Sequence, residues 1–225
     1  MQTHIDPSTS RATVSSVPGA VRCVILEGIS WETYERLLAE HNESSGTHFT
    51  YDQGRLEIMV LSAEHEAIKH ALETLVEVLA EELNIDVRGF GSTTLRRADV
   101  DRGFEPDACF YIQHESLVRG KRAIALATDP PPDLVIEIDV TSLSLNKLPL
   151  FATLGVPEVW RYDGMRVTVL TLIGNTYAEV ATSAALPGVS GEILGHFVET
   201  NLQLKQTAWL RKVREWVREN LNRGR

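Results

Sequence analysis

The sequence predicts a single α/β domain in which helices flank a mixed β-sheet. Several short runs alternate apolar and polar residues, as strands do, and the stretch after Ser62 has the spacing of an amphipathic helix. A strand–helix–strand unit then follows hairpin-like segments, which favours a mixed sheet. Of the 225 residues, 43% are hydrophobic, enough for one well-filled core.

The N-terminal third contains two helices around a hairpin. Ser30 is a suitable N-cap for a helix over residues 31–40, and two alternating runs at 49–51 and 56–59 flank a turn at Gly54. Ser62 caps the longer helix. Its apolar residues recur at spacings of three, four and one, which predicts a single buried stripe. The stripe comprises Ile68, Leu72, Leu75, Val76, Leu79 and Leu83.

The rest of the domain is predicted to be mostly strands. A helix from about Leu145 ends before Gly155, whose lack of a Cβ suits the position after a helix. The expected strands lie at about 85–90, 93–97, 107–112, 134–140, 158–162, 166–172 and 177–180.

Composition divides the chain into three parts. Residues 1–20 are rich in Ser, Thr and Pro and are expected to be a disordered tail. Residues 21–204 form the domain, and 205–225 form a basic amphipathic helix with Leu210, Val213 and Val217 on one face. This helix has a net charge of +5 in a chain of −9, which fits a solvated face better than a DNA contact.

Nothing in the sequence predicts export or membrane insertion. The N-terminus has no charged segment followed by an apolar one, and no run approaches the roughly 20 apolar residues that cross a bilayer. Cys23 and Cys109 are the only cysteines and form no metal-binding pattern. We therefore expect a cytoplasmic protein without membrane association.

Carboxylates on two predicted strands form the strongest candidate site. Asp107 opens one strand, and Glu137 and Asp139 share a face of another whose remaining residues are apolar. Carboxylates in so apolar a strand are costly without compensation, and Mg²⁺ or Mn²⁺ supplies it through oxygen ligands. The alternative is that Glu137 and Asp139 face solvent on a sheet open on one side.

The start of the long helix offers a further acidic residue. Glu64 lies four residues before Ile68 and is expected to lean toward the buried side. The segment from His65 to His70 is similar to a zinc-protease helix, but histidines five residues apart diverge by roughly 140° and cannot share one metal. His65 alone either lines the acidic pocket or acts as a capping or surface residue.

At these residues the chain resembles the Uma family of restriction endonucleases, within the PD-(D/E)XK nuclease superfamily. The resemblance covers roughly residues 29–172. It rests on the order and spacing of SWETYERL, YDQGRLEIM, SAEH, EPDACFYI, PDLVIEIDVTS and NKLPLFATLGVPEVWRYD. It implies a restriction-endonuclease-like fold, with a central mixed sheet flanked by helices, and a site that cleaves phosphodiesters.

The resemblance also assigns residues to roles. Asp107 and Glu137 fall on the motif acids, and Glu64 falls on the acidic residue of the first long helix. The superfamily pattern has Lys where this chain has Asp139, while Lys147 matches a lysine position typical of the family. We therefore expect Lys147 to reach back into the site and take the place of the absent lysine.

Three functions remain open. The first is a Mg²⁺- or Mn²⁺-dependent DNA endonuclease with Asp107, Glu137, Lys147 and Glu64 as catalytic residues and Asp139 as a further metal ligand. The second is an inactive nucleic-acid-binding or protein-interaction module on the same fold, which the acidic net charge and Asp139 favour. The third is a hydrolase of small phosphorylated metabolites. A homodimer is expected, because two-fold symmetry suits cleavage of both DNA strands.

Overall fold

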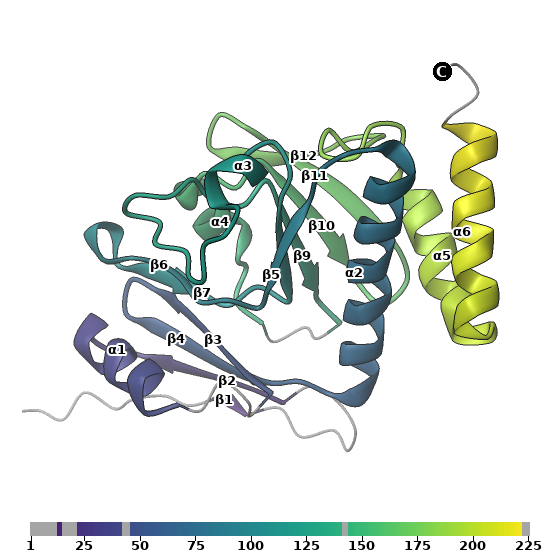
Figure 1. The fold of residues 1–225 in the computed structure, drawn as a ribbon. Helices are drawn as coiled ribbons and strands as arrows, with labels where there is room; N and C mark the ends of the chain where they lie inside the picture. The colour runs from purple at the N-terminus through teal and green to yellow at the C-terminus, as the bar shows by residue number, and fades with distance from the viewer. Residues whose placement is uncertain (1–12, 15–21, 42–45, 141–143, 222–225) are drawn as a thin grey trace, which may run out of the picture.

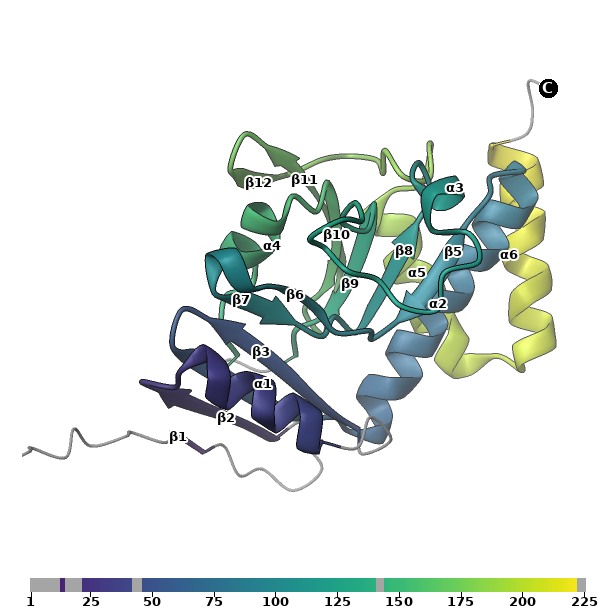
Figure 2. The same ribbon diagram turned by 60° about the vertical axis from the view of Figure 1, so that its left-hand side comes forward.

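The strands form two sheets that lie against each other, with the helices Trp31–Glu40 and Ala63–Leu83 on their outer sides (Figures 1 and 2). The computed structural model describes residues 13–14, 22–41, 46–140 and 144–221. The first sheet has the order β1 (Thr13–Val14), β2 (Arg22–Glu27), β4 (Arg55–Val60), β3 (Thr47–Asp52), β7 (Arg102–Phe104) and β6 (Leu95–Arg97). The second has the order β12 (Thr176–Glu179), β11 (Val167–Ile173), β10 (Glu158–Tyr162), β9 (Leu134–Ile138), β8 (Ala108–Tyr111) and β5 (Arg88–Gly91).

The first sheet is antiparallel and is covered on its outer face by α1 (Trp31–Glu40). Tyr34 of α1 is fully buried and stacks on Tyr51 of β3, while Leu56 of β4 belongs to the same apolar cluster. Because side chains alternate along a strand, Glu57, the next residue after Leu56, points to the inner face. The inner face of this sheet therefore carries polar residues toward the second sheet.

The second sheet is mixed, because β9 and β10 run parallel while its other pairs are antiparallel. One face packs on α2 (Ala63–Leu83), whose six predicted stripe residues are all buried. The other face packs on the short helix α4 (Leu148–Leu154). A third short helix, α3 (Glu115–Val118), follows β8. Alternation along β9 thus sends Ile136 and Ile138 toward α2 and leaves Glu137 on the α4 side.

Two C-terminal helices, α5 (Gly191–Gln203) and α6 (Gln206–Asn220), pack on the outer side of α2 (Figure 1). Trp209, Val213 and Val217 of α6 are fully buried against this layer. Arg214 and Arg218 form ion pairs with glutamates of α2, so part of the basic charge is used within the molecule. Within the described ranges no helix is both long and apolar enough to cross a membrane.

The predicted fold class is confirmed, with strands and helices combined around a mixed sheet. The strands divide between two sheets where one was expected, and the sequence pattern missed β1, β2, β7, α3 and α5. In the tail, Thr13 and Val14 form β1 and pair with β2, while the expected disorder of residues 1–20 stays a prediction. The remaining tail residues lie outside the described residues, as do 222–225 of the predicted C-terminal helix.

Candidate active site

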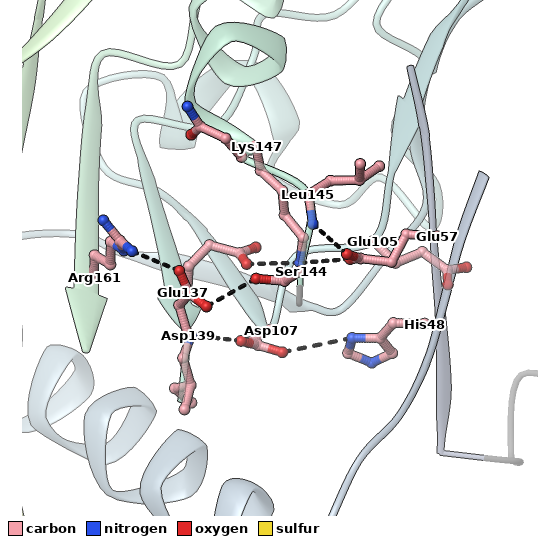
Figure 3. A network of polar contacts seen from close by, with 12 residues as sticks. His48, Glu57, Glu105, Asp107, Glu137, Asp139, Ser144, Leu145, Lys147 and Arg161 are labelled. Atoms are coloured by element: carbon pink, nitrogen blue, oxygen red, sulfur yellow. Dashed lines mark hydrogen bonds and ion pairs between the residues drawn. The ribbon is translucent and has the colours of Figure 1, made fainter. Parts of the chain in front are cut away.

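Polar side chains from both sheets meet between their inner faces, next to the start of α4 (Figure 3). The first sheet contributes His48 from β3 and Glu57 from β4. The second contributes Asp107, which directly precedes β8, and Glu137 from β9. His65 from α2 and Lys147 from the residue before α4 complete the cluster, which we call the inter-sheet cluster. The cluster joins segments far apart in the chain.

Asp107 is buried and held in one orientation. Its Oδ2 accepts a hydrogen bond from the backbone N–H of Ile138 at 2.7 Å, which ties it to the end of β9. Two imidazoles flank the carboxylate: His65 Nε2 lies 3.3 Å from Oδ2, and His48 Nδ1 lies 3.6 Å from Oδ1. Burial alone would raise the pKa of Asp107, but His48 and His65, with Lys147, lower it well below its usual range. Asp107 is therefore ionised.

Lys147 reaches the middle of β9. Its Nζ donates a hydrogen bond to Glu137 Oε2 at 2.9 Å and lies 3.6 Å from Glu57 Oε1. Lys147 occupies the N-cap position of α4, and Pro149 in the first turn suits the helix start there. Burial would lower the pKa of Lys147, but the surrounding Glu137, Glu57 and Asp107 raise it above its usual range. Lys147 is therefore a fixed cation within the cluster.

Glu57 is one of two residues of the inter-sheet cluster, with His48, that the sequence pattern did not predict. It is 1% exposed, and its Oε2 accepts hydrogen bonds from the backbone N–H of Leu145 at 2.6 Å and from the Cys23 thiol. Through Leu145 it connects the first sheet to the segment before α4. The available indication was a carboxylate between Leu56 and Ile58 in a run of apolar residues. By itself that run predicts only a hairpin strand.

The inter-sheet cluster contains more carboxylates than ammonium groups. Glu57, Asp107 and Glu137 face the single ammonium group of Lys147. Burial raises the pKa of Glu137 to about 7; Lys147 opposes this shift, and Asp107 and Glu57 add to it. Glu57 Oε1 and Glu137 Oε1 are buried without a hydrogen-bond partner among the described residues. Native proteins rarely bury unpaired polar atoms, so these oxygens indicate a place for a cation or water.

His65 also has buried nitrogens that lack a hydrogen-bond partner among the described residues. Neither ring nitrogen forms a hydrogen bond of good geometry with a residue that the structure describes, although Nε2 lies close to Asp107. Burial would lower the pKa of His65, but the adjacent Asp107, with Glu137 and Glu66, raises it. Of the two alternatives left open by the sequence, His65 lines the acidic pocket; its backbone N–H also bonds to the capping Ser62.

The expected orientation of Glu64 is wrong. Its side chain is exposed, and the next residue, His65, turns inward in its place. Residues three and four positions before Ile68 both lie near its face of the helix, so the spacing alone could not choose between them. The alternative that Glu137 faces solvent is also wrong, because Glu137 is 6% exposed.

Asp139 lies at the edge of the cluster and is bound by other partners. Its Oδ2 pairs with Arg161 of β10 at 2.6 Å, and its Oδ1 accepts a hydrogen bond from Ser144 at 2.8 Å. A cleft of about 580 Å³ opens here and is lined by Glu137, Asp139, Lys147 and Arg161 among others. The cleft gives an outside molecule access to the Lys147 side of the cluster.

The donor set fits a hard divalent cation only in part. Among the residues that the structure describes, no three His, Cys, Asp or Glu side chains are placed to hold a metal ion together. Mg²⁺, however, is commonly held by one or two carboxylates, with water and substrate phosphate as its other ligands. The unpaired oxygen of Glu137 and the ionised Asp107 are compatible with that mode. We conclude that the residues suit a metal bound together with substrate.

A protein-family model and a solved structure match this chain. The model of a family described as "Uma2: Putative restriction endonuclease" matches residues 31–204. A crystal structure titled as a putative nuclease belonging to DUF820 from Anabaena variabilis is 16% identical, with a TM-score of 0.52 over 81% of this chain and 99% of that one. At that identity the likeness concerns the fold alone. No curated protein matches the chain. Because the family model spans most of its length, the chain belongs to the Uma2 family of restriction-endonuclease-like proteins.

Proposed function

We propose that this protein is a divalent-metal-dependent DNA endonuclease whose active site is the inter-sheet cluster. The observation that carries the proposal is the buried Oε1 of Glu137, which has no hydrogen-bond partner among the described residues and lies beside Lys147 in the wall of an open cleft. Membership in a family of nuclease-like proteins supports phosphodiesters as the substrate class. The phosphates of DNA would bring the oxygen ligands that the cluster lacks.

In this proposal Asp107 and Glu137 hold one Mg²⁺ or Mn²⁺. Bound there, the ion would lower the pKa of a water molecule and neutralise charge on the scissile phosphate. Water would add to phosphorus and give up a proton to solvent, and the bond to one bridging oxygen would break as that oxygen takes up a proton from solvent, which leaves one phosphomonoester end and one hydroxyl end. His48 and His65 keep Asp107 ionised and oriented.

Lys147 acts as a cation rather than as a base, because its environment favours the protonated form. Its ammonium group, held by Glu137, would stabilise the negative charge that develops on the phosphate. Glu57 positions both Lys147 and the segment before α4. Asp139 is a less favourable metal ligand than the sequence predicted, since Arg161 and Ser144 already bind it.

A second candidate is a binding module that keeps the fold without turnover. The contact of Lys147 with Glu137 favours it, because an internal ion pair already neutralises one carboxylate. A homodimer and a cytoplasmic location remain predictions under either function.

Nicking of supercoiled plasmid separates the two candidates. The protein should nick DNA with Mg²⁺ or Mn²⁺ and stop when a chelator is added, whereas Glu137→Gln should be inactive. DNA binding without nicking by the wild type would support the binding module instead. A matched control is Glu64→Gln, which changes an exposed carboxylate in the first turn of α2 and should cleave DNA normally.

A further inference from the structure

Arg161 presents a second cation to the cleft from the strand next to Glu137. In the parallel pair of β9 and β10, Arg161 lies directly opposite Glu137, so both side chains project on the same face of the sheet. The Arg161 side chain is 44% exposed, whereas that of Lys147 is 11% exposed. The two cations therefore line one cleft at different depths, with Lys147 inside and Arg161 toward the opening.

Asp139 orients the guanidinium group of Arg161 but binds only part of its N–H donors. Asp139 binds one of its terminal nitrogens at 2.6 Å, and Asp139 is itself held by Ser144 (Figure 3). A guanidinium has several N–H donors in a rigid planar fork. Among the described residues, Arg161 pairs with Asp139. The remaining N–H donors of Arg161 are therefore available to a ligand in the cleft. Such a fork matches two oxygens of a phosphate group.

We infer that Arg161 binds the phosphate adjacent to the scissile one, so that the substrate of this site is a polynucleotide chain rather than a compound with a single phosphate. The inference rests on the proposed function, since it takes the scissile phosphate to lie at the inter-sheet cluster beside Lys147. Asp139 is then a positioning residue that keeps the guanidinium at the mouth of the cleft. This arrangement also explains how a chain of net charge −9 could bind DNA locally.

The competing explanation is an ordinary surface ion pair. Exposed ion pairs contribute little to stability, so Arg161→Ala would then change neither folding nor function appreciably. If Arg161 instead binds a flanking phosphate, its removal matters only for substrates that have one. The number of phosphates in the substrate therefore discriminates between the two explanations.

The first experiment measures binding of a fluorescent oligonucleotide in Ca²⁺ as a function of salt. Loss of one phosphate contact should reduce the slope of log K against log salt by about 0.7 for single strands or about 0.9 for duplex DNA. We expect this for Arg161→Ala, with partial recovery in Arg161→Lys. The control is Arg166→Ala, which removes an exposed arginine that pairs with Glu179 and is not among the residues lining this cleft. An unchanged slope in Arg161→Ala, or no DNA binding by the wild type, would overturn the inference.

The second experiment compares two substrates at the same metal site. Arg161→Ala should lower Mn²⁺-dependent cleavage of an oligonucleotide by about tenfold, equivalent to a contact of about 1.4 kcal/mol. It should leave hydrolysis of bis(p-nitrophenyl) phosphate, which has one phosphate, unchanged. Equal losses on both substrates would place Arg161 at the scissile group and contradict the inference. If the wild type binds DNA but cleaves neither substrate, the proposed function fails while the salt slopes still decide the role of Arg161.

Discussion

Two buried glutamates on neighbouring strands have opposite surroundings. Glu158 of β10 is 2% exposed, and both of its oxygens are bound. Oε1 accepts from Trp160 Nε1 at 2.7 Å and from the Ser183 hydroxyl, and Oε2 accepts from the backbone N–H groups of Ala184 and Ala185. These uncharged donors fasten the 183–185 loop to the sheet. Glu158 is thus fully compensated by the protein itself.

Glu137 of β9 is almost as deeply buried, but within the described part of the chain one of its oxygens accepts a hydrogen bond and the other has no hydrogen-bond partner. Its single donor is the cation Lys147, and other carboxylates lie nearby. The difference shows how burial of a charge can be interpreted. A carboxylate whose oxygens are all bound by neutral donors stabilises the fold, whereas one left with an open oxygen and excess charge is a candidate binding site.

The largest expected effect concerns stability at Glu158. Glu158→Ala leaves several buried donors without an acceptor and should lower the free energy of unfolding by about 3 kcal/mol or more. Glu137→Ala should cost far less, because it also removes repulsion from Asp107 and Glu57. Urea denaturation without added metal measures both. Equal losses of unfolding free energy in the two variants would contradict the difference between Glu158 and Glu137.

Removal of the Lys147 cation should have the next largest effect. Lys147→Ala is expected to lower metal-dependent DNA cleavage by about 10²-fold or more, as when a preorganised electrostatic group is lost. Lys121→Ala, which removes a half-exposed lysine paired with Asp129, provides the matched control. Initial rates of plasmid nicking measure the effect. Equal rates in wild type and Lys147→Ala would exclude a catalytic role for this lysine.

The pH dependence of stability should differ between wild type and Glu137→Gln. Burial raises the pKa of Glu137 from 4.5 to about 7, so the folded protein holds this proton more tightly than the unfolded chain. Its stabilising contribution is complete below about pH 4.5 and is lost as the pH rises through 7. Glu137→Gln cannot titrate and should therefore gain stability relative to wild type across this window. We expect a relative gain of about 1 kcal/mol or more, or roughly 2–4 °C in Tm.

The pKa shift of Asp107 has the opposite effect on the pH dependence of stability. Its lowered pKa contributes stability above its unfolded value of 3.8, and this contribution is lost as the pH falls. Thermal unfolding of wild type and Glu137→Gln in metal-free buffers measures the difference. A difference in Tm that stays constant with pH would show that Glu137 is ionised in both states.

The smallest effect is expected at Asp139. Its side chain is 26% exposed and its charge is balanced by Arg161, so this pair should contribute no more than about 1 kcal/mol to stability. Asp139→Asn should therefore change Mn²⁺ affinity by less than about threefold, far below the change expected at Glu137. Titration calorimetry measures this. A large loss of affinity would restore Asp139 as a metal ligand.

Patterns along the chain predicted much of this structure because they depend on local periodicity. The apolar stripe of α2 and the alternation of β9 were evident from spacing, and they fix which face carries Glu137. The strand pattern and the resemblance to the family both pointed to Asp107, the resemblance alone pointed to Lys147, and the structure places both beside that glutamate.

What the sequence could not predict depends on how the two sheets meet. Glu57 and His48 become buried only because the inner face of the first sheet closes over the second. The Arg161–Asp139 pair depends on the register between β9 and β10, which no local pattern specifies. The choice of His65 over Glu64 depends on a rotation of about 100° per residue around the helix axis.

The central claim is that Asp107 and Glu137, the carboxylates of the second sheet in the inter-sheet cluster, bind a divalent cation, and that exposed carboxylates do not. Calorimetric titration of Mn²⁺ into wild type, Asp107→Asn, Glu137→Gln and Glu64→Gln tests it most directly. We predict that Asp107→Asn and Glu137→Gln each weaken Mn²⁺ binding by about tenfold or more. Glu64→Gln, at an exposed position, should bind as wild type does. Unchanged affinity in both Asp107→Asn and Glu137→Gln would contradict the account.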